Sequence, residues 1–92
     1  MTPSPQYRLH AVQRMFERGI SIKNVGHALE SGETIEDYSA DMGAPGRLIL
    51  GSQGKRAFHV VASEDPRTGQ ITVITVYTPD LDRWKKDHRT RR

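Results

Sequence analysis

A histidine and an arginine one helical turn apart are the first residues in this chain whose types suggest chemistry on a phosphate. His10 and Arg14 lie four residues apart, so they are neighbours on one side of a helix that contains both. An imidazole acts as general acid or base near neutral pH, and a guanidinium grips phosphate through two parallel hydrogen bonds. Such groups are typical of metal-free phosphodiester cleavage.

A second set of polar residues lies where the sequence predicts β-strands. His59 interrupts an apolar run, and Thr75 and Tyr77 belong to the next one. Because side chains alternate along a strand, Thr75 and Tyr77 fall on one face. Arg47 begins the preceding strand, so the four residues can gather on or beside one sheet. If His10 reaches this cleft, His10 and His59 would be acid and base, and Tyr77 would stack on or orient a base.

Each of these residues also has a purely structural interpretation. A histidine in an apolar strand is often a core residue hydrogen-bonded to a carbonyl group. His10 and Arg14 can form an ordinary solvated helix face. Arg47 can pair with the acidic run after Gly32, and Tyr77 can be a core ring with its hydroxyl at the surface.

Other kinds of site find no support in the sequence. The chain has no cysteine, which excludes thiolate metal sites, disulfides and cysteine nucleophiles. No glycine-rich phosphate loop and no serine nucleophile motif occurs. The four histidines, His10, His27, His59 and His88, show no spacing typical of metal ligands. We therefore expect neither a cofactor nor a metal.

The elements that would position these residues begin with a β-hairpin. Residues 56–62 and 71–77 are rich in β-branched and aromatic residues, which favour strands. Between them, residues 65–69 hold a proline and a glycine, as a tight turn requires. On alternation, Phe58, Val60 and Ala62 share one face of the first arm, and Val73, Thr75 and Tyr77 share one face of the second.

Two helices are predicted before the sheet. The first covers about residues 6–18, has an apolar stripe of Leu9, Val12 and Phe16 with Met15 beside it, and ends at Gly19. The second starts after Ser21 as N-cap and ends at Gly32.

The remaining segments complete an α+β fold. Residues 33–38 and 47–51 predict two more strands, residues 39–46 a loop, and residues 52–55 a turn. Asp80 would cap a short C-terminal helix docked by Leu81 and Trp84. The predicted fold is thus two N-terminal helices, a four-stranded antiparallel sheet and a short C-terminal helix in one domain, residues 1–92.

Charge is concentrated at the end of the chain. Residues 1–80 carry 8 Lys and Arg against 9 Asp and Glu, whereas residues 81–92 carry 6 against 2. We expect residues 1–5 to be a flexible lead-in and residues 86–92 a frayed basic tail, which can contact RNA or simply be solvated. With no membrane span and no secretory signal, we expect a cytoplasmic protein.

Several short motifs follow one another in a recognisable order. In chain order they are His10-x-x-x-Arg14-Met15-x-x-Arg18-Gly19-Ile20-Ser21, Leu29-Glu30-Ser31-Gly32-Glu33-x-Ile35, Arg47-x-x-Leu50-Gly51, Phe58-His59-Val60-Val61, and Ile74-Thr75-Val76-Tyr77-x-Pro79-Asp80 with Trp84. From about residue 8 to residue 85 the chain resembles the small bacterial domain-of-unknown-function family numbered four-two-five-eight. That family in turn resembles the RelE/ParE-type toxins of toxin–antitoxin pairs.

The resemblance implies a RelE-like fold and a metal-independent endoribonuclease restrained by a small, zinc-finger antitoxin-like partner protein. It implies catalytic roles for His10, His59 and Tyr77, and phosphate-binding or substrate-binding roles for Arg14, Arg18, Arg47 and Thr75. Two alternatives stay open: a non-catalytic module that binds a partner by strand addition, and a module that binds RNA through the basic tail without cleaving it.

Overall fold

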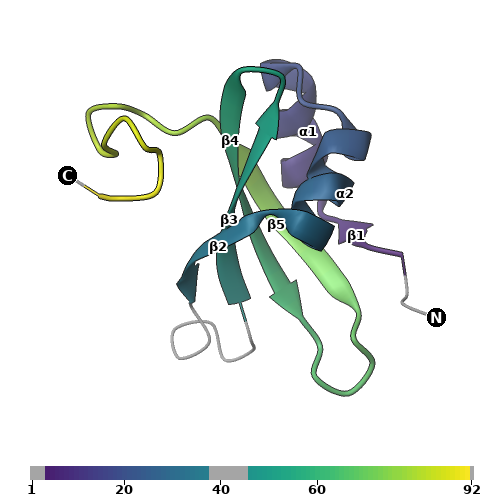
Figure 1. Ribbon diagram of the computed structural model, residues 1–92. Coiled ribbons are helices and arrows are strands. Elements are labelled where there is room, and N and C mark those ends of the chain that lie inside the picture. Colours follow the sequence, from purple (N-terminus) through teal and green to yellow (C-terminus); the bar gives the residue numbers. More distant parts are fainter. Residues whose placement is uncertain (1–3, 38–45, 92) are drawn as a thin grey trace.

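Two helices cover one face of a twisted sheet, and the C-terminal residues lie on the opposite side of that sheet (Figure 1). The computed structural model describes residues 4–37 and 46–91. The predicted loop 39–46 falls mostly outside these residues. The helices are α1 (Leu9–Arg18) and α2 (Ile22–Ser31). Their main contacts are α1 with β5 (Ile71–Tyr77) and α2 with β3 (Gly46–Gln53).

The predicted hairpin is confirmed at the centre of the sheet. It consists of β4 (Arg56–Glu64) and β5, which pair antiparallel. Gly69 in its turn has φ +76°, and Gly54 in the turn between β3 and β4 has φ +61°. Both angles lie in the left-handed region, which glycine adopts without steric cost. The glycines in these short segments were therefore sufficient to predict the two turns.

The predicted four-stranded antiparallel sheet is wrong, because the sheet has five strands and one parallel pair. The strand order is β1-β5-β4-β3-β2, where β1 is Gln6–Tyr7 and β2 is Glu33–Asp37. Gln6 and Tyr7 pair in parallel with Thr72 and Val73. The sequence analysis had assigned them to the first helix, since a strand of two residues is too short to show alternation.

Both helix ends agree with the prediction. Gly19 terminates α1 with φ +66°, and its backbone N–H bonds to the last turn of the helix. The hydroxyl of Ser21 accepts a hydrogen bond from the backbone N–H of Asn24 at 3.1 Å, as an N-cap does. Gly32 follows the last residue of α2. These signals act within a few residues, so they survive any change in tertiary context.

The predicted apolar stripe of α1 does not face the core. Phe16 is 88% exposed and Leu9 is 72% exposed, whereas Ala11 and Met15 are buried. The entry of the helix sets its rotation: the backbone N–H of Arg8 bonds to the carbonyl of Val73 at 3.0 Å, directly after the β1–β5 pair. That anchor turns the side of α1 that carries Ala11 and Met15 towards the core and leaves Leu9 and Phe16 outside.

The core lies between the helices and the sheet. The faces of β4 are as predicted, with Phe58, Val60 and Ala62 in the core. Close approach of α2 depends on Gly51 in β3. A Cβ atom added there would lie 2.7 Å from the Cβ of Ala28 and 2.8 Å from the ring of Phe58. Any larger residue at position 51 would therefore push α2 away from the sheet.

The predicted faces of β5 are only partly right. The register with β4 shifts between Val61, which pairs with Thr75, and Ala62, which pairs with Val73. This β-bulge places both Val73 and Val76 in the core, although simple alternation puts them on opposite faces. Thr75 and Tyr77 remain on the face away from the helices, because their partners there are Val61 and His59.

The predicted C-terminal helix does not exist. The backbone N–H groups of Arg83 and Trp84 bond to the carbonyl of Asp80, which makes a single turn. The next N–H, that of Lys85, bonds instead to the carbonyl of Thr90 at 2.8 Å. Residues 80–91, here called the C-terminal segment, therefore fold back on themselves without a helix. Burial of Trp84, which is 2% exposed, outweighs local helical preference.

The exposure difference within α1 is testable with two neighbouring residues. Met15→Ala should lower the free energy of unfolding by about 2–5 kcal/mol, because it leaves a cavity in the core. Phe16→Ser should change it by less than about 0.5 kcal/mol, because its ring lies in solvent. Urea denaturation followed by circular dichroism measures both. A larger loss for Phe16→Ser than for Met15→Ala would contradict this placement of α1.

Candidate functional site

An exposed histidine of α1 meets β5 at the edge of the sheet. The Nε2 atom of His10 lies 3.0 Å from the Oγ1 atom of Thr75. The two residues are 65 positions apart in sequence, so the fold brings this predicted pair together. An imidazole whose one nitrogen is fixed by a hydroxyl keeps its other nitrogen available for proton transfer. The arrangement can therefore support general acid–base chemistry at the surface.

Two predicted phosphate-binding arginines lie on the same helix as His10. The guanidinium of Arg14 forms an ion pair with Glu17 at 3.0 Å, and both side chains are about half exposed. Arg18 is exposed in the last turn, and its carbonyl accepts a hydrogen bond of 2.6 Å from Arg56. A third guanidinium, from β4, thus joins the end of this row, and sequence analysis missed it.

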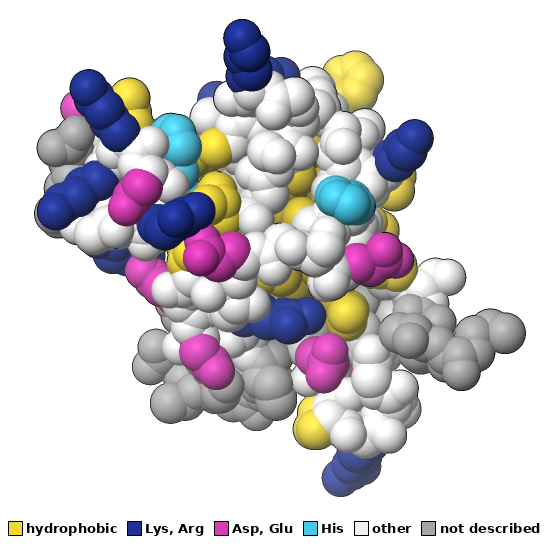
Figure 2. All heavy atoms as spheres, viewed as in Figure 1, with side chains coloured by type: hydrophobic (Ala, Val, Ile, Leu, Met, Phe, Trp, Pro, Cys, Tyr) yellow, Lys and Arg dark blue, Asp and Glu magenta, His cyan; other side chains and the backbone are white. Residues whose placement is uncertain are grey.

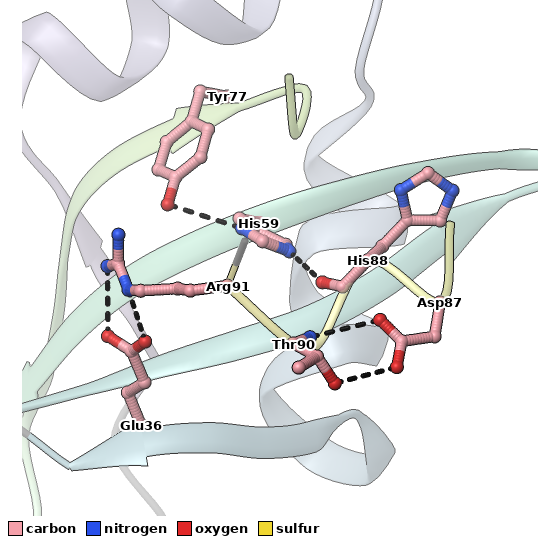
Figure 3. A network of polar contacts seen from close by, with 7 residues as sticks. All are labelled: Glu36, His59, Tyr77, Asp87, His88, Thr90 and Arg91. Carbon is pink, nitrogen blue, oxygen red and sulfur yellow. Dashed lines mark hydrogen bonds and ion pairs between the residues drawn. The ribbon is translucent and has the colours of Figure 1, made fainter. Parts of the chain in front are cut away.

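His59 faces away from the helices and is nonetheless fully buried (Figure 3). Its Nε2 atom lies 2.6 Å from the backbone carbonyl of His88, so Nε2–H must donate this bond. In the neutral imidazole Nδ1 is then an acceptor, and the hydroxyl of Tyr77, 3.2 Å away, donates to it. Both nitrogens are satisfied within the protein.

Aromatic rings enclose the same imidazole. The ring of Trp84 packs edge-on against His59 with centroids 4.6 Å apart, and the ring of Tyr77 does so at 5.2 Å. Burial lowers the pKa of His59 below its ordinary value, and the hydrogen bond to His88 opposes this effect only in part. Burial raises the pKa of Tyr77. The fold therefore favours the neutral forms of both side chains.

Two ion pairs fasten the C-terminal segment to β2, the edge strand, and Figure 3 shows the one between Arg91 and Glu36. Arg91 grips Glu36 through two hydrogen bonds of 2.6 and 3.0 Å, and Arg89 lies 2.8 Å from Glu33. The guanidinium of Arg91 also lies 4.5 Å from the centre of the Trp84 ring. The sequence held no signal for these contacts, because their partners are more than fifty residues apart.

A short turn inside the C-terminal segment is held by Asp87. Its carboxylate accepts hydrogen bonds from the backbone N–H groups of Arg89 and Thr90 and from the Thr90 hydroxyl. These bonds lower the pKa of Asp87 to about 2. His88 within the turn has φ +61°, which aims its carbonyl at His59.

The pairs His10–Thr75 and His59–Tyr77 thus share strand β5 but differ in their exposure to solvent. Thr75 and Tyr77 lie two residues apart on the same face of β5, which separates their Cα atoms by about 7 Å. His10 and His59 each contact one of them. His10 is exposed, whereas the C-terminal segment covers His59. Only the His10 pair is open to a substrate in this conformation.

Arg47 lies apart from the other predicted site residues. Its cross-strand partner on β4 is Ala62, in the core on the helix side, so Arg47 belongs to the face opposite His59. It lines an open groove of about 1170 Å³ between α2 and the residues around β1. The groove also contains Tyr7, Lys23, His27 and Glu30.

Residues 4–37 and 46–91 form neither a metal cluster nor a membrane-spanning helix. No three His, Asp or Glu side chains there gather in a way that could hold a metal ion. No helix there is long and apolar enough to cross a membrane.

Comparison with known proteins identifies the family. A family model described as a domain of unknown function (DUF4258) matches residues 7–78, so the chain belongs to that family. No curated protein matches the chain, and no solved structure matches it. The similarity to RelE/ParE-type toxins stays a prediction, as do the roles predicted for the site residues.

The buried imidazole predicts a specific loss of stability in mild acid. Since folding lowers the pKa of His59 below the ordinary 6.5, the unfolded chain binds the extra proton first as pH falls. The free energy of unfolding should be fully retained above about pH 6.5 and decrease below it, by at most about 1.4 kcal/mol per pH unit.

Urea titrations between about pH 5 and 8 measure this dependence. His59→Gln should be less stable at neutral pH and should lack the component that disappears below the ordinary histidine pKa. His27→Gln, at an exposed position of α2, serves as the matched control and should retain it. Equal pH dependence in wild type and His59→Gln would contradict the neutral, buried state of His59.

Proposed function

We propose that this protein is a metal-independent endoribonuclease, the toxin component of a bacterial toxin–antitoxin pair, acting in the cytoplasm. The observation that carries the proposal is the exposed His10–Thr75 pair beside Arg14. These residues supply a proton-transfer group and a phosphate-binding group at one edge of the sheet. The matched family has no assigned activity, so the proposal depends on this geometry and on the resemblance to RelE/ParE-type toxins.

In the proposed reaction the 2′-hydroxyl of RNA attacks the adjacent phosphate. With Nε2 of His10 held by Thr75, Nδ1 accepts the proton of that hydroxyl. The P–O5′ bond breaks and the leaving 5′-oxygen takes a proton from water, which leaves a 2′,3′-cyclic phosphate and a 5′-hydroxyl end. A guanidinium has five N–H donors, so Arg14 can bind the phosphate oxygens while it keeps its bond to Glu17. Tyr77, two residues beyond Thr75, would contact a neighbouring base.

The structure changes the roles within the predicted set. His10 takes the catalytic role in this proposal, and Arg14 and Arg18 bind phosphate. His59 has both nitrogens occupied and no exposed surface, so it positions Tyr77 and the C-terminal segment. Arg47 lies on the other face and is left out of the reaction.

Cleavage of RNA in the presence of EDTA tests the proposal. His10→Ala should lower the cleavage rate by about 10²–10⁴-fold, the usual contribution of a general acid–base group. Thr75→Val, which removes one hydrogen bond, should lower it by about tenfold. Gel electrophoresis of end-labelled single-stranded RNA, free and bound to ribosomes, gives the rates and the chemistry of the ends.

His27→Ala is the matched control, because His27 is an exposed histidine on the other helix and should keep the wild-type rate. Wild-type rates in His10→Ala would reveal a contaminating nuclease or another active site. Absence of cleavage in both RNA forms would favour a non-catalytic role.

A non-catalytic interaction module is the second candidate, and the exposed face of α1 favours it. Phe16 and Leu9 lie seven residues apart on one side of the helix and are largely exposed. Such a stripe suits the apolar face of a partner, here the proposed small antitoxin-like protein. β2 is also the last strand in the sheet order, so a partner can add a strand beside it.

Co-purification with the product of the adjacent gene tests this partner. Phe16→Ser should weaken the complex at least tenfold, because it removes the largest exposed apolar side chain, while Gln13→Ser on the same helix should not. Isothermal titration calorimetry measures both. Equal affinities would exclude the α1 stripe as the interface.

A further inference from the structure

The C-terminal segment covers a polar and aromatic patch that resembles a binding surface more than a core. The covered residues are His59 and Tyr77. The ring of Trp84, which belongs to the segment, packs edge to face against His59, and so does the ring of Tyr77. An open hollow of about 360 Å³ adjoins them, and its lining consists of Tyr77, Thr78, Asp80, Arg83, Trp84 and Arg91. Aromatic rings beside arginines are the usual surface on which unpaired bases stack.

Two of the contacts that hold the segment down are ion pairs between side chains. Arg89–Glu33 is an ion pair with both side chains 52% exposed, and Arg91–Glu36 joins side chains that are 55% and 25% exposed. Half-exposed ion pairs contribute little to stability and weaken with salt. A hydrogen bond from His59 to the carbonyl of His88 links the segment to the sheet at a buried point.

The charge of the segment indicates what replaces those carboxylates. Residues 81–91 contain five cations, at Arg83, Lys85, Lys86, Arg89 and Arg91, against Asp82 and Asp87. Figure 2 shows the dark-blue side chains projecting outward where Figure 1 places the C-terminal end. Arg91 already binds an anion with a two-point grip, and phosphate offers the same pair of oxygens.

We propose that the C-terminal segment is a binding site for single-stranded RNA, whose phosphates replace Glu33 and Glu36 at Arg89 and Arg91. As the segment lifts, unpaired bases stack on Trp84 and Tyr77 and offset the loss of their burial. Lifting uncovers His59 beside Tyr77, on the same strand face as the His10–Thr75 pair. The choice of RNA as ligand rests on the proposed function.

This exchange is selective for single strands. Replacing one anion by another at each arginine leaves the number of ion pairs unchanged, so phosphate alone has little reason to lift the segment. Exposure of Trp84, which is 2% exposed, then needs compensation by a stacking partner. A duplex keeps its bases inside and offers phosphates only.

Trp84 is the only tryptophan of the chain, so its fluorescence reports on the segment directly. The probe is a 2′-O-methyl oligouridine of about ten nucleotides, which lacks the free 2′-hydroxyl and cannot be cleaved by the proposed reaction. We expect it to quench Trp84 emission on binding, whereas a 2′-O-methyl duplex of equal charge should not. Arg89→Gln should reduce the slope of log affinity against log salt concentration by about 0.7, the value for one lost phosphate contact.

Removing the competing carboxylates should have the opposite effect. Glu33→Gln and Glu36→Gln should each tighten binding by up to about fivefold, the equivalent of a half-exposed ion pair. Glu30→Gln on α2 removes the same charge without touching the segment and is the matched control. Without RNA, the double variant Glu33→Gln/Glu36→Gln should also show faster modification of His59 by diethyl pyrocarbonate, read by mass spectrometry.

Three results would overturn this inference: no binding of the oligouridine, binding without a change at Trp84, or equal quenching by the duplex. Equal affinity of Glu36→Gln and Glu30→Gln would do so as well. Cleavage of RNA with an unchanged Trp84 signal would leave the ribonuclease proposal standing. Conversely, quenching by the uncleavable oligomer without cleavage of unmodified RNA would overturn the ribonuclease proposal alone.

Discussion

The buried imidazole of His59 is the constraint on which the second face of the sheet depends. A polar group without exposed surface must find hydrogen-bond partners, since an unsatisfied one costs about 1–3 kcal/mol. Tyr77 supplies one partner from the neighbouring strand. The carbonyl of His88 supplies the other, and it reaches the ring only because the C-terminal segment crosses the sheet. The hydrogen bonds that His59 requires therefore hold the twelve residues of the C-terminal segment against the sheet. Trp84 excludes water from this contact.

This arrangement gives the two faces of the sheet different characters. The helix face is a conventional core in which Gly51 lets α2 approach closely and Val60 and Val76 are completely buried. The opposite face is covered by rings, a buried hydrogen bond and two ion pairs, of which the half-exposed Arg89–Glu33 pair is worth at most about 1 kcal/mol. A cover of that kind detaches more easily than a helix, and it carries the highest density of positive charge in the chain. Access to His59 and charge for RNA binding are thus properties of the same segment.

Some features of the candidate site have local causes in the sequence, and others depend on long-range contacts. His10 and Arg14 stand together because they lie one turn apart on a helix, which the spacing predicted correctly. The partner of His10 is Thr75, 65 positions away. Strand alternation suggested Thr75 as a site residue, but it could not show that Thr75 lies next to His10. Arg47 was grouped with this set because it begins a neighbouring strand. The register of β3 with β4 pairs Arg47 with Ala62 and so puts it on the other face. A shift of the pairing by one residue would have reversed this result.

What the sequence alone determined are the features with a cause inside a few residues: the left-handed glycines at 19, 54 and 69, the cap at Ser21, and the β4–β5 hairpin. Tertiary structure decided the parallel β1–β5 pair, the rotation of α1 that leaves Phe16 in solvent, and the route of the C-terminal segment. The physical reason is the range of the interactions. Turns and caps depend on backbone angles and neighbouring hydrogen bonds, whereas strand pairing, helix rotation and the partners of His59 depend on surfaces that meet only in the folded chain.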